Sequence, residues 1–300
     1  MKEKYLITGS SGFLGTNFKP LLNEDFTIKT LGLSSEDDYN LNIANSIPEF
    51  NQSFDVVLHA AGKAHVIPKT KEEEKSFFDI NYQGTVNLCR GLEISGLPKS
   101  IIFVSTVAVY GLEIGENITE DYPLKGDNPY ALSKIKAEQF LTEWSNKHNV
   151  TLGIIRPSLI AGPNPPGNLG AMIKGITTGK YLSIAGGKAR KSVLMVQDIT
   201  RLLPALIEKG GVYNVCDDTH PTFSQLEALI AKQLNKKPPI SIPYSVAKLI
   251  ATVGDLSGDK APINSIKLNK ITKSLTFSNE KAKRELNWQP LNVLENFKIK

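Results

Sequence analysis

The chain has little cysteine and no long uninterrupted apolar segment, and these two shortages exclude several classes of protein. Its 300 residues include two cysteines, Cys89 and Cys216, whose wide separation fits neither a disulfide framework nor a zinc site. We therefore expect free thiols, no metal centre and a cytoplasmic location. The most apolar late stretch, 244–256, is shorter than the roughly 20 residues that cross a bilayer and is interrupted by a lysine. We expect no membrane span, and no secretion, because no apolar leader precedes the first strand-like run.

The net charge is modest. Thirty-five lysines and arginines against 30 aspartates and glutamates give +5, and the cations are scattered apart from mild clusters at 188–191 and 267–273. A nucleic-acid-binding protein usually has a denser basic face with aromatic residues between the cations. We therefore expect no nucleic-acid partner, and the small excess fits a pocket for an anionic small molecule better.

Apolar strand-like runs alternate with helical segments through the first half of the chain. The runs lie at 5–8, 26–33, 54–59, 100–105 and 151–155, with helical segments to about 22, at about 72–95 and at 129–148. Continuous apolar strands separated by helices indicate a parallel sheet covered on both faces. The sequence predicts an α/β fold, a Rossmann-type doubly wound parallel sheet.

The character of the chain changes after Arg156-Pro157, because glycine, proline and asparagine dominate 162–168. Runs at 193–196 and 212–215, with a helix from Asp198 between them, are expected to rejoin the sheet. We predict a dinucleotide-binding domain at 1–157, with about 191–215 returning to it. A smaller, mostly helical substrate-binding lobe is expected at about 158–190 and 216–300.

A glycine-rich turn follows the first strand-like run and opens the first helix. It reads Gly9-Ser10-Ser11-Gly12-Phe13-Leu14-Gly15. Glycines there let the chain turn tightly and approach a pyrophosphate, while the helix N-terminus offers free N–H groups to the phosphates. In this strand–turn–helix context the pattern predicts dinucleotide binding.

The end of the second strand bears on the choice between NAD and NADP. An acidic residue there would bind the ribose hydroxyls of NAD, but the segment reads Gly32-Leu33-Ser34-Ser35. Ser34 and Ser35 can donate to a 2′-phosphate, so the sequence favours NADP and leaves NAD open. A shift of alignment would bring Asp37 or Asp38 to the ribose instead.

A tyrosine and a lysine four residues apart form a candidate catalytic pair. Tyr130 and Lys134 begin the 129–148 helix, on the stripe whose apolar continuation faces the sheet. A free phenol has a pKa of about 10, and an adjacent ammonium and an oxidised nicotinamide would lower it. Tyr130 can then exchange a proton with a substrate hydroxyl while the nicotinamide exchanges a hydride at the same carbon. Thr106 follows a buried strand and is expected to hold that oxygen.

These motifs stand in an order that is typical of one family. The chain resembles the extended short-chain dehydrogenase/reductases, in their nucleotide-sugar epimerase/dehydratase branch, at Gly9/Gly12/Gly15, His59-Ala60-Ala61-Gly62, Asn81-Tyr82-Gln83-Gly84-Thr85, Ser105-Thr106-Val107-Ala108-Val109-Tyr110-Gly111, Tyr130/Lys134 and Arg156-Pro157. The resemblance implies that Thr106, Tyr130 and Lys134 are catalytic. It implies cofactor contacts from Gly9, Ser11, Gly12, Phe13, Leu14, Gly15, Ser34, Leu41, Ala60, Ala61, Gly62, Asn81, Ser105, Tyr130, Lys134 and Pro157.

Where the sequence differs from the family pattern, it reduces the number of reactions that the chain is expected to catalyse. Sugar 4,6-dehydratases carry Asp-Glu after the catalytic threonine, but Val107 and Ala108 stand there and cannot move a proton. The chain resembles the UDP-linked 4-keto-6-deoxy-N-acetylhexosamine 4-reductases of bacterial surface-polysaccharide synthesis, and their epimerase relatives, at His59-Ala60-Ala61-Gly62-Lys63-Ala64-His65-Val66, Gly167-Asn168-Leu169 and Arg190-Lys191-Ser192-Val193. Substrate contacts are implied for His65, Thr106, Val107, Asn168, Arg190 and Lys191, with Lys191 in place of an arginine on the diphosphate.

Three functions stay open at this point. The favoured one is an NAD(P)H-dependent reductase acting at C4 of a nucleotide sugar, and the second is a 4-epimerase with tightly held NAD. The third is a non-catalytic nucleotide-binding sensor or scaffold of the same fold. The resemblance also implies a homodimer in which the helices at about 72–95 and 129–148 form a four-helix bundle.

Overall fold

The computed structural model describes residues 2–22, 26–64, 66–256 and 263–299. Its strands are β1 (Lys4–Thr8), β2 (Thr27–Gly32), β3 (Tyr39–Asn40), β4 (Val56–His59), β5 (Ser100–Val104), β6 (Gly115–Ile118), β7 (Thr151–Pro157), β8 (Leu159–Ala161), β9 (Ser183–Ile184), β10 (Val193–Met195), β11 (Gly211–Val215), β12 (Ser241–Ile242) and β13 (Leu275–Phe277). Its α-helices are α1 (Phe13–Phe18), α2 (Lys71–Phe78), α3 (Gly84–Ser95), α4 (Pro129–His148), α5 (Gly167–Thr177), α6 (Val196–Lys209), α7 (Phe223–Gln233), α8 (Tyr244–Asp255), α9 (Ser265–Thr272), α10 (Glu280–Leu286) and α11 (Val293–Asn296).

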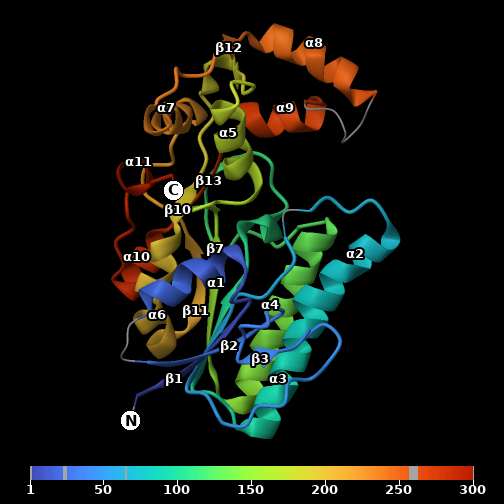
Figure 1. Ribbon diagram of the computed structural model, residues 1–300, viewed down its shortest axis with the longest axis vertical. Coiled ribbons are helices and arrows are strands. Elements are labelled where there is room, and N and C mark those ends of the chain that lie inside the picture. Colours follow the sequence, from blue (N-terminus) through green and yellow to red (C-terminus); the bar gives the residue numbers. More distant parts are fainter. Residues whose placement is uncertain (1, 23–25, 65, 257–262, 300) are drawn as a thin grey trace.

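Seven parallel strands form the central sheet, in the order β11-β7-β5-β4-β1-β2-β3. The chain first builds outward from β1 to β3, and then returns to build from β4 towards β11 on the other side. The order therefore reverses between β1 and β4, which is where doubly wound sheets form a ligand crevice. The Rossmann-type α/β fold is confirmed (Figure 1).

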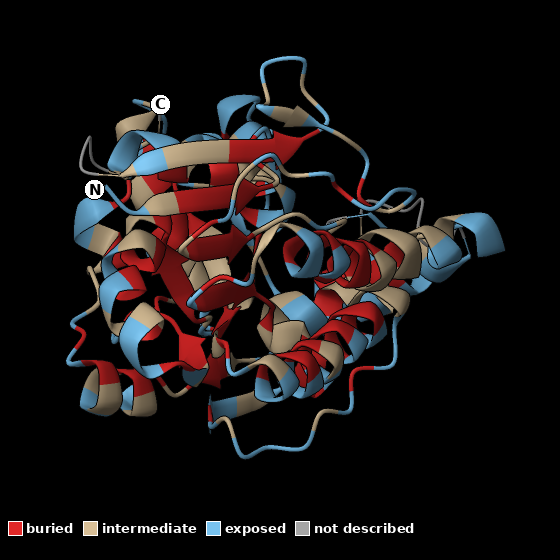
Figure 2. Cartoon of the chain, turned by 90° about the horizontal axis from the view of Figure 1, so that it is seen from below, coloured by how far each residue is buried: buried red, intermediate tan, exposed pale blue. Residues whose placement is uncertain are grey.

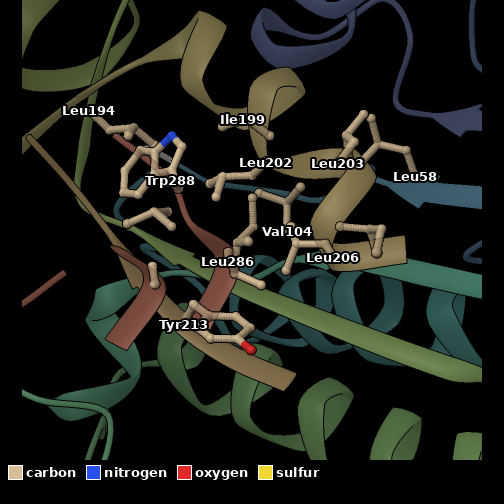
Figure 3. Packing of buried hydrophobic residues seen from close by; sticks show 14 of the residues in the cluster. Leu58, Val104, Leu194, Ile199, Leu202, Leu203, Leu206, Tyr213, Leu286 and Trp288 are labelled. Carbon is tan, nitrogen blue, oxygen red and sulfur yellow. The ribbon is translucent and has the colours of Figure 1, made fainter. Parts of the chain in front are cut away.

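Alternate residues of the strands fill two separate cores, one on each face of the sheet. Ile7, Leu58 and Ile102 pack with α1, α6 and α10. Figure 3 shows part of this cluster, in which side chains of α6 lie near Leu58 and Val104. The residues directly before these in the sequence, Leu6, Val57 and Ile101, pack instead with α3 and α4. The central strands β1, β4 and β5 are buried on both sides, whereas the edge strands β2 and β3 are partly exposed (Figure 2).

The remaining strands form three small parallel pairs in the second half of the fold, β8 with β10, β9 with β12 and β6 with β13. The expectation that two late runs rejoin the sheet holds for β11, which pairs with β7, and fails for β10. The reason is that β10 is buried between two cores: Leu194 packs in the sheet core, whereas Val193 and Met195 pack with α5 and α7. The division into two domains stays a prediction.

Two helices also differ from the sequence expectation. The first α-helix ends at Phe18 and continues as a 3₁₀ turn that contains Pro20, since proline cannot donate the hydrogen bond of an α-helix interior. The segment at 72–95 is two helices joined by a π-helical turn at Asp79–Gln83. Among the described residues, no helix combines the length and the apolar character that a bilayer crossing needs.

Candidate active site

A cavity of about 360 Å³ opens at the carboxyl ends of β1, β4, β5 and β7, a volume within the range of small-molecule sites. It brings together the glycine turn, the segment after β4, the end of β5 and the start of α4. The lining residues are Gly9, Gly12, Phe13, Leu14, Ala60, Gly62, Lys63, Ala64, Val104, Ser105, Thr106, Tyr130, Lys134, Pro157, Ser158, Leu159, Ile160 and Pro166.

The glycine turn fits a dinucleotide. Gly9 has φ +72°, and a Cβ on it would lie 2.8 Å from the Ala61 backbone, so only glycine allows this approach. Gly12 caps α1 without any side-chain hydrogen bond, in contrast to Thr70 and Asn128, whose side chains cap α2 and α4. The first-turn N–H groups of α1 are therefore available to a pyrophosphate at the cavity wall.

The adenosine end holds a carboxylate that follows β2 by five residues. Asp37 accepts hydrogen bonds from the Ser10 hydroxyl and, at 3.0 Å, from the Ser34 backbone N–H. It lies so close to Gly32, at the end of β2, that a Cβ there would be 2.4 Å from its Oδ2. Asp38 is turned away and pairs with Lys29 at 2.7 Å. The loop after β2 thus folds back and supplies the acidic group that Gly32–Ser35 lacks.

Thr106, Tyr130 and Lys134 all line this cavity. Asn128 caps α4 by accepting from Ala131 N–H at 3.0 Å, and Pro129 occupies the first turn, which fixes where Tyr130 begins the helix. The Thr106 hydroxyl hydrogen-bonds the Tyr130 phenol. Lys134 Nζ donates to the Val104 carbonyl at 2.8 Å and lies 4.5 Å from the centre of the Phe103 ring.

The electrostatics of the tyrosine differ from the sequence expectation. Burial raises the pKa of Tyr130, and the Thr106 hydrogen bond opposes that rise. The expected lowering by Lys134 is absent, since its ammonium is directed at a backbone carbonyl and an aromatic ring. Burial also lowers the pKa of Lys134, to about 8, while Glu138 works to raise it. The chain alone therefore leaves the phenol protonated at neutral pH, and the charge of an oxidised nicotinamide is what remains to favour the phenolate.

A buried ion pair between Arg156 and Glu138 lies next to this site. Arg156 of β7 donates to Glu138 of α4 at 2.6 and 3.1 Å, and both side chains are almost fully buried. Glu138 also accepts from the Ser105 hydroxyl, and Arg156 donates to the Tyr110 hydroxyl at 3.0 Å. The network joins the ends of β5 and β7 to α4, and so fixes the helix that carries Tyr130 and Lys134.

Asn81 lies at the π-helical turn and is buried. Its amide donates to Ser133 Oγ at 2.9 Å and to the Lys63 carbonyl, and it accepts from the Lys63 N–H at 2.6 Å. It therefore ties the segment after β4 to α4. Such π turns are frequent at functional sites, because they redirect one side chain out of the helical pattern.

His59 is buried below the cavity floor and connects three elements. Its ring nitrogens hydrogen-bond Thr8 of β1 at 2.6 Å and Thr85 of α3 at 2.8 Å. Burial, with a smaller contribution from the Lys134 charge, lowers the pKa of His59 to about 3. The imidazole is therefore neutral in the folded chain and holds β1, β4 and α3 in register.

This lowered pKa predicts acid destabilisation. Between about pH 6.5 and 3 the unfolded chain binds a proton at His59 that the folded chain does not, so the free energy of unfolding falls as the pH falls. The stability advantage of the native protein over His59→Gln should shrink by up to about 1.4 kcal/mol per pH unit in this window. Urea unfolding of both proteins between pH 7 and pH 4 measures it, since other titrating groups contribute equally to both. A pH-independent difference would contradict the assignment.

The other predicted cofactor residues that do not line the cavity lie close to the glycine turn or to the end of β2. Gly15 packs on Gly9 and Ser10, and Leu41 N–H donates to the Gly32 carbonyl at 2.9 Å beside Ser34. Ser11 is exposed at the glycine turn. The roles assigned to all of these residues stay predictions.

The predicted substrate residues are more dispersed. Asn168 is exposed at the start of α5, and the Arg190 guanidinium donates to the carbonyls of His220 and Thr219 at 3.1 and 3.3 Å. Lys191 is half-buried, and burial, together with the Lys270 charge and against that of Glu113, lowers its pKa to about 8. Val107 is half-buried beside Thr106. His65 lies outside the described residues.

Ser158 was missed by sequence reasoning. Its hydroxyl is buried, lines the cavity and has no hydrogen-bond partner within the described part of the chain. Its position directly after β7 is the signal that could have found it, because sites of parallel sheets gather where strands end. Its hydroxyl is available to a molecule bound in the cavity.

Comparison with known proteins agrees with this geometry. Residues 5–216 match the NAD dependent epimerase/dehydratase family. The chain is 31% identical to N-acetyl-alpha-D-glucosaminyl-diphospho-ditrans,octacis-undecaprenol 4-epimerase of Escherichia coli O157:H7, over 94% of this chain and 89% of the relative. It is 27% identical to GDP-6-deoxy-D-mannose reductase of Pseudomonas aeruginosa, over 77% of this chain and 80% of the relative.

Solved structures share the fold over nearly the whole chain. RMD from Pseudomonas aeruginosa complexed with NADPH has a TM-score of 0.72 at 21% identity, covering 98% of this chain and 95% of its own. The UDP-glucose 4-epimerase of Thermus thermophilus complexed with NAD has a TM-score of 0.70 at 19% identity, covering 96% and 94%. The family match extends from β1 past β11, so it includes every strand of the central sheet and the edge of the sheet that carries the cavity. The chain therefore belongs to the NAD dependent epimerase/dehydratase family.

Proposed function

We propose that the chain is a 4-epimerase that inverts C4 of a hexose or N-acetylhexosamine attached to a diphosphate, with NAD as bound cofactor. The observation that carries this proposal is the convergence of Thr106, Tyr130 and Lys134 with the glycine turn on one cavity. A relative named as a 4-epimerase of a diphosphate-linked N-acetylglucosamine, 31% identical, supports the choice of reaction. We propose that the sugar serves surface-polysaccharide synthesis on the cytoplasmic side.

The residues divide the chemistry among them. A bound nicotinamide supplies hydride transfer at the C4 carbon. Tyr130 takes the proton of the C4 hydroxyl as a carbonyl forms there, and Thr106 hydrogen-bonds that oxygen in both states. Lys134 would bind the nicotinamide ribose and would contribute positive charge there. After the 4-keto sugar turns over in the cavity, Tyr130 would return the proton to the oxygen as the hydride returns to the opposite face of C4, so that no net oxidation would occur.

The sequence favoured reduction, and reduction remains the second candidate. A relative named as a GDP-6-deoxy-D-mannose reductase and a structural neighbour complexed with NADPH support it. The two reactions differ in what they consume. We expect UDP-N-acetylglucosamine or its polyprenyl-diphosphate counterpart to be converted to the C4 epimer, detected by NMR, without added cofactor and without a change in nicotinamide absorbance. Stoichiometric NADPH oxidation with a 4-keto sugar, and no epimer, would replace epimerisation with reduction.

The cofactor preference rests on Asp37. Its carboxylate beside Gly32 is suited to accept from the adenosine ribose and to repel a 2′-phosphate, so we propose NAD in place of the NADP that the sequence favoured. Asp37→Asn should improve the affinity ratio of NADPH to NADH by about tenfold or more, because a hydrogen bond to a charged group is worth about 1.5–3 kcal/mol.

Asp38→Asn is the matched control, since that carboxylate pairs with Lys29 on the outer side of the same loop. Fluorescence titration with NADH and NADPH compares both variants with the native protein. An unchanged ratio in Asp37→Asn would refute the assignment of Asp37 to the ribose.

A homodimer is part of the proposal. Helices α3 and α4 lie side by side on one face of the sheet (Figure 1), and α4 presents Leu132 while α3 presents Ile94 to the surface. We expect sedimentation at micromolar concentration to give twice the chain mass, and a monomer would remove the four-helix interface.

A further inference from the structure

Helix α8 exposes its large apolar residues and buries small ones, which is the reverse of what a helix that packs only on the rest of its own chain does. Its buried face is made of two alanines, Ala247 and Ala251, which pack on Leu268 of α9. At 3.6 residues per turn, the larger apolar residues gather instead within an arc of about 120°. They are Val246, Leu249, Ile250, Val253 and Leu256, and all five are exposed, Leu249 at 69% and Leu256 at 89%.

Exposed apolar residues are concentrated in this part of the molecule. Nineteen large hydrophobic residues are exposed among those that the structure describes, and eight of them lie between Ile240 and Ile266. In Figure 1 helices α8 and α9 form one end of the molecule, opposite the end near α3. Isolated exposed apolar residues are common, but a continuous helical stripe of them indicates a surface that contacts something.

The same segment is strongly basic. Residues 236–273 contain seven lysines and two aspartates, an excess of +5 that equals the net charge of the whole chain. Asp255 is exposed at the end of α8, and its carboxylate accepts from Ser265 N–H and Oγ at 2.8 and 2.6 Å. On α9, Lys270 follows Ile266 at i+4, is exposed with it and pairs with Glu113 at 3.5 Å. Lys273, which directly follows α9, is also exposed.

We propose that α8 and α9 dock on the anionic surface of a phospholipid bilayer, with the apolar stripe of α8 lying in the headgroup region. An apolar helical stripe beside clustered lysines is what interfacial helices present to anionic lipid. A second copy of this chain is a poorer occupant, because two such surfaces would bring their lysines together. The pair of helices lies on the membrane and does not cross it.

If the proposed function holds, a membrane-docking surface indicates which group the sugar diphosphate is attached to. Lys191, the residue expected at the diphosphate, lies close enough to Lys270 of α9 for the ammonium of Lys270 to lower its pKa. Both lysines lie near Glu113, which pairs with Lys270 at 3.5 Å, so a charged cluster of both signs stands between the expected diphosphate site and the docking helices. The substrate class is a sugar joined through diphosphate to a membrane-embedded polyprenol, whose lipid stays in the bilayer while the sugar reaches the cavity.

Vesicle binding tests the surface independently of catalysis. The native protein should co-sediment with vesicles of phosphatidylcholine and about 30% phosphatidylglycerol, and much less with phosphatidylcholine alone. The double variant Leu249→Ser/Val253→Ser should bind the anionic vesicles at least tenfold more weakly. Leu33→Ser, which removes an equally exposed residue that follows β2, should bind as the native protein does. Thermal melts establish that each variant is folded.

Three results would overturn the docking proposal: no binding of the native protein to anionic vesicles, equal binding of the double variant, or a loss of dimer mass in the double variant. The last would assign the stripe to a contact between copies. Activity separates this inference from the proposed function. The double variant should epimerise a soluble short-chain polyprenyl-diphosphate sugar normally and the vesicle-embedded undecaprenyl substrate at least tenfold more slowly. Vesicle binding without epimerisation of either substrate would retain the surface and reject the function.

Discussion

Replacing Tyr130 with phenylalanine should reduce turnover by about 10²–10⁴-fold, the usual effect of losing a general acid–base group. The ring still fills its place next to Phe77, so the shape of the cavity wall is preserved. On the proposed function the phenol lies at the nicotinamide end of the cofactor, away from the pyrophosphate and the adenosine, so we expect NAD affinity to change little. Steady-state rates with a saturating substrate, together with NADH titration, measure the two effects separately.

Tyr122→Phe is the matched control for this substitution, because Tyr122 is an exposed tyrosine outside the cavity. It should retain native turnover. A Tyr130→Phe protein with turnover within a few-fold of native would remove the proton-transfer role and, with it, the proposed reaction.

The Tyr130 phenol should also respond to the cofactor. Since burial raises its pKa in the chain alone, the phenolate should form more readily once oxidised cofactor is bound. Ultraviolet difference spectra with and without NAD would detect this shift.

Glu138→Gln should lower the free energy of unfolding by about 3–5 kcal/mol, the range for removing one partner of a buried ion pair. The substitution keeps the shape but removes the charge that offsets the buried guanidinium of Arg156. It also leaves the buried ammonium of Lys134 without its nearby carboxylate. Two uncompensated cations beside the site are the physical reason for the large effect, which urea unfolding measures.

Asp79→Asn is the control for Glu138→Gln. Asp79, the first residue of the π-helical turn, pairs with Lys75 of α2 at 2.7 Å, at i,i+4 spacing and with both side chains exposed. Its loss should change the unfolding free energy by no more than about 0.5 kcal/mol. Equal small effects in the two variants would show that the Glu138–Arg156 network does not hold α4 in place.

Most of the fold could be predicted because its signals are local. The apolar runs of β1, β4, β5 and β7 are continuous, as strands buried on both faces must be, and Asn128-Pro129 defines the start of α4 to the residue. The π-helical turn could not be predicted, since Asp79–Gln83 has ordinary helix-forming residues. It is fixed by the hydrogen bonds of Asn81 to Lys63 and Ser133, which are distant in sequence.

The cavity could be predicted only in part, because some of its residues are placed by contacts between segments that are distant in sequence. Thr106, Tyr130, Lys134 and the glycine turn follow from motif spacing. Asp37 could not be assigned, because its approach to Gly32 depends on the path of a loop that returns to β2. The apolar character of α8 is evident in the sequence, but its exposed stripe becomes visible only once Ala247 and Ala251 are found on the buried side.

The strand order has a consequence for how the protein emerges during synthesis. Six of the seven sheet strands, including β7, are complete by residue 157, but β11, the partner of β7 on its outer side, spans Gly211–Val215. A nascent chain can therefore assemble most of the sheet while β7 still presents an unpaired backbone edge, the kind of edge that invites pairing between chains. Ribosome-bound chains truncated between β7 and β11 should be the ones that aggregate or recruit chaperones, and chains extended past residue 215 should not.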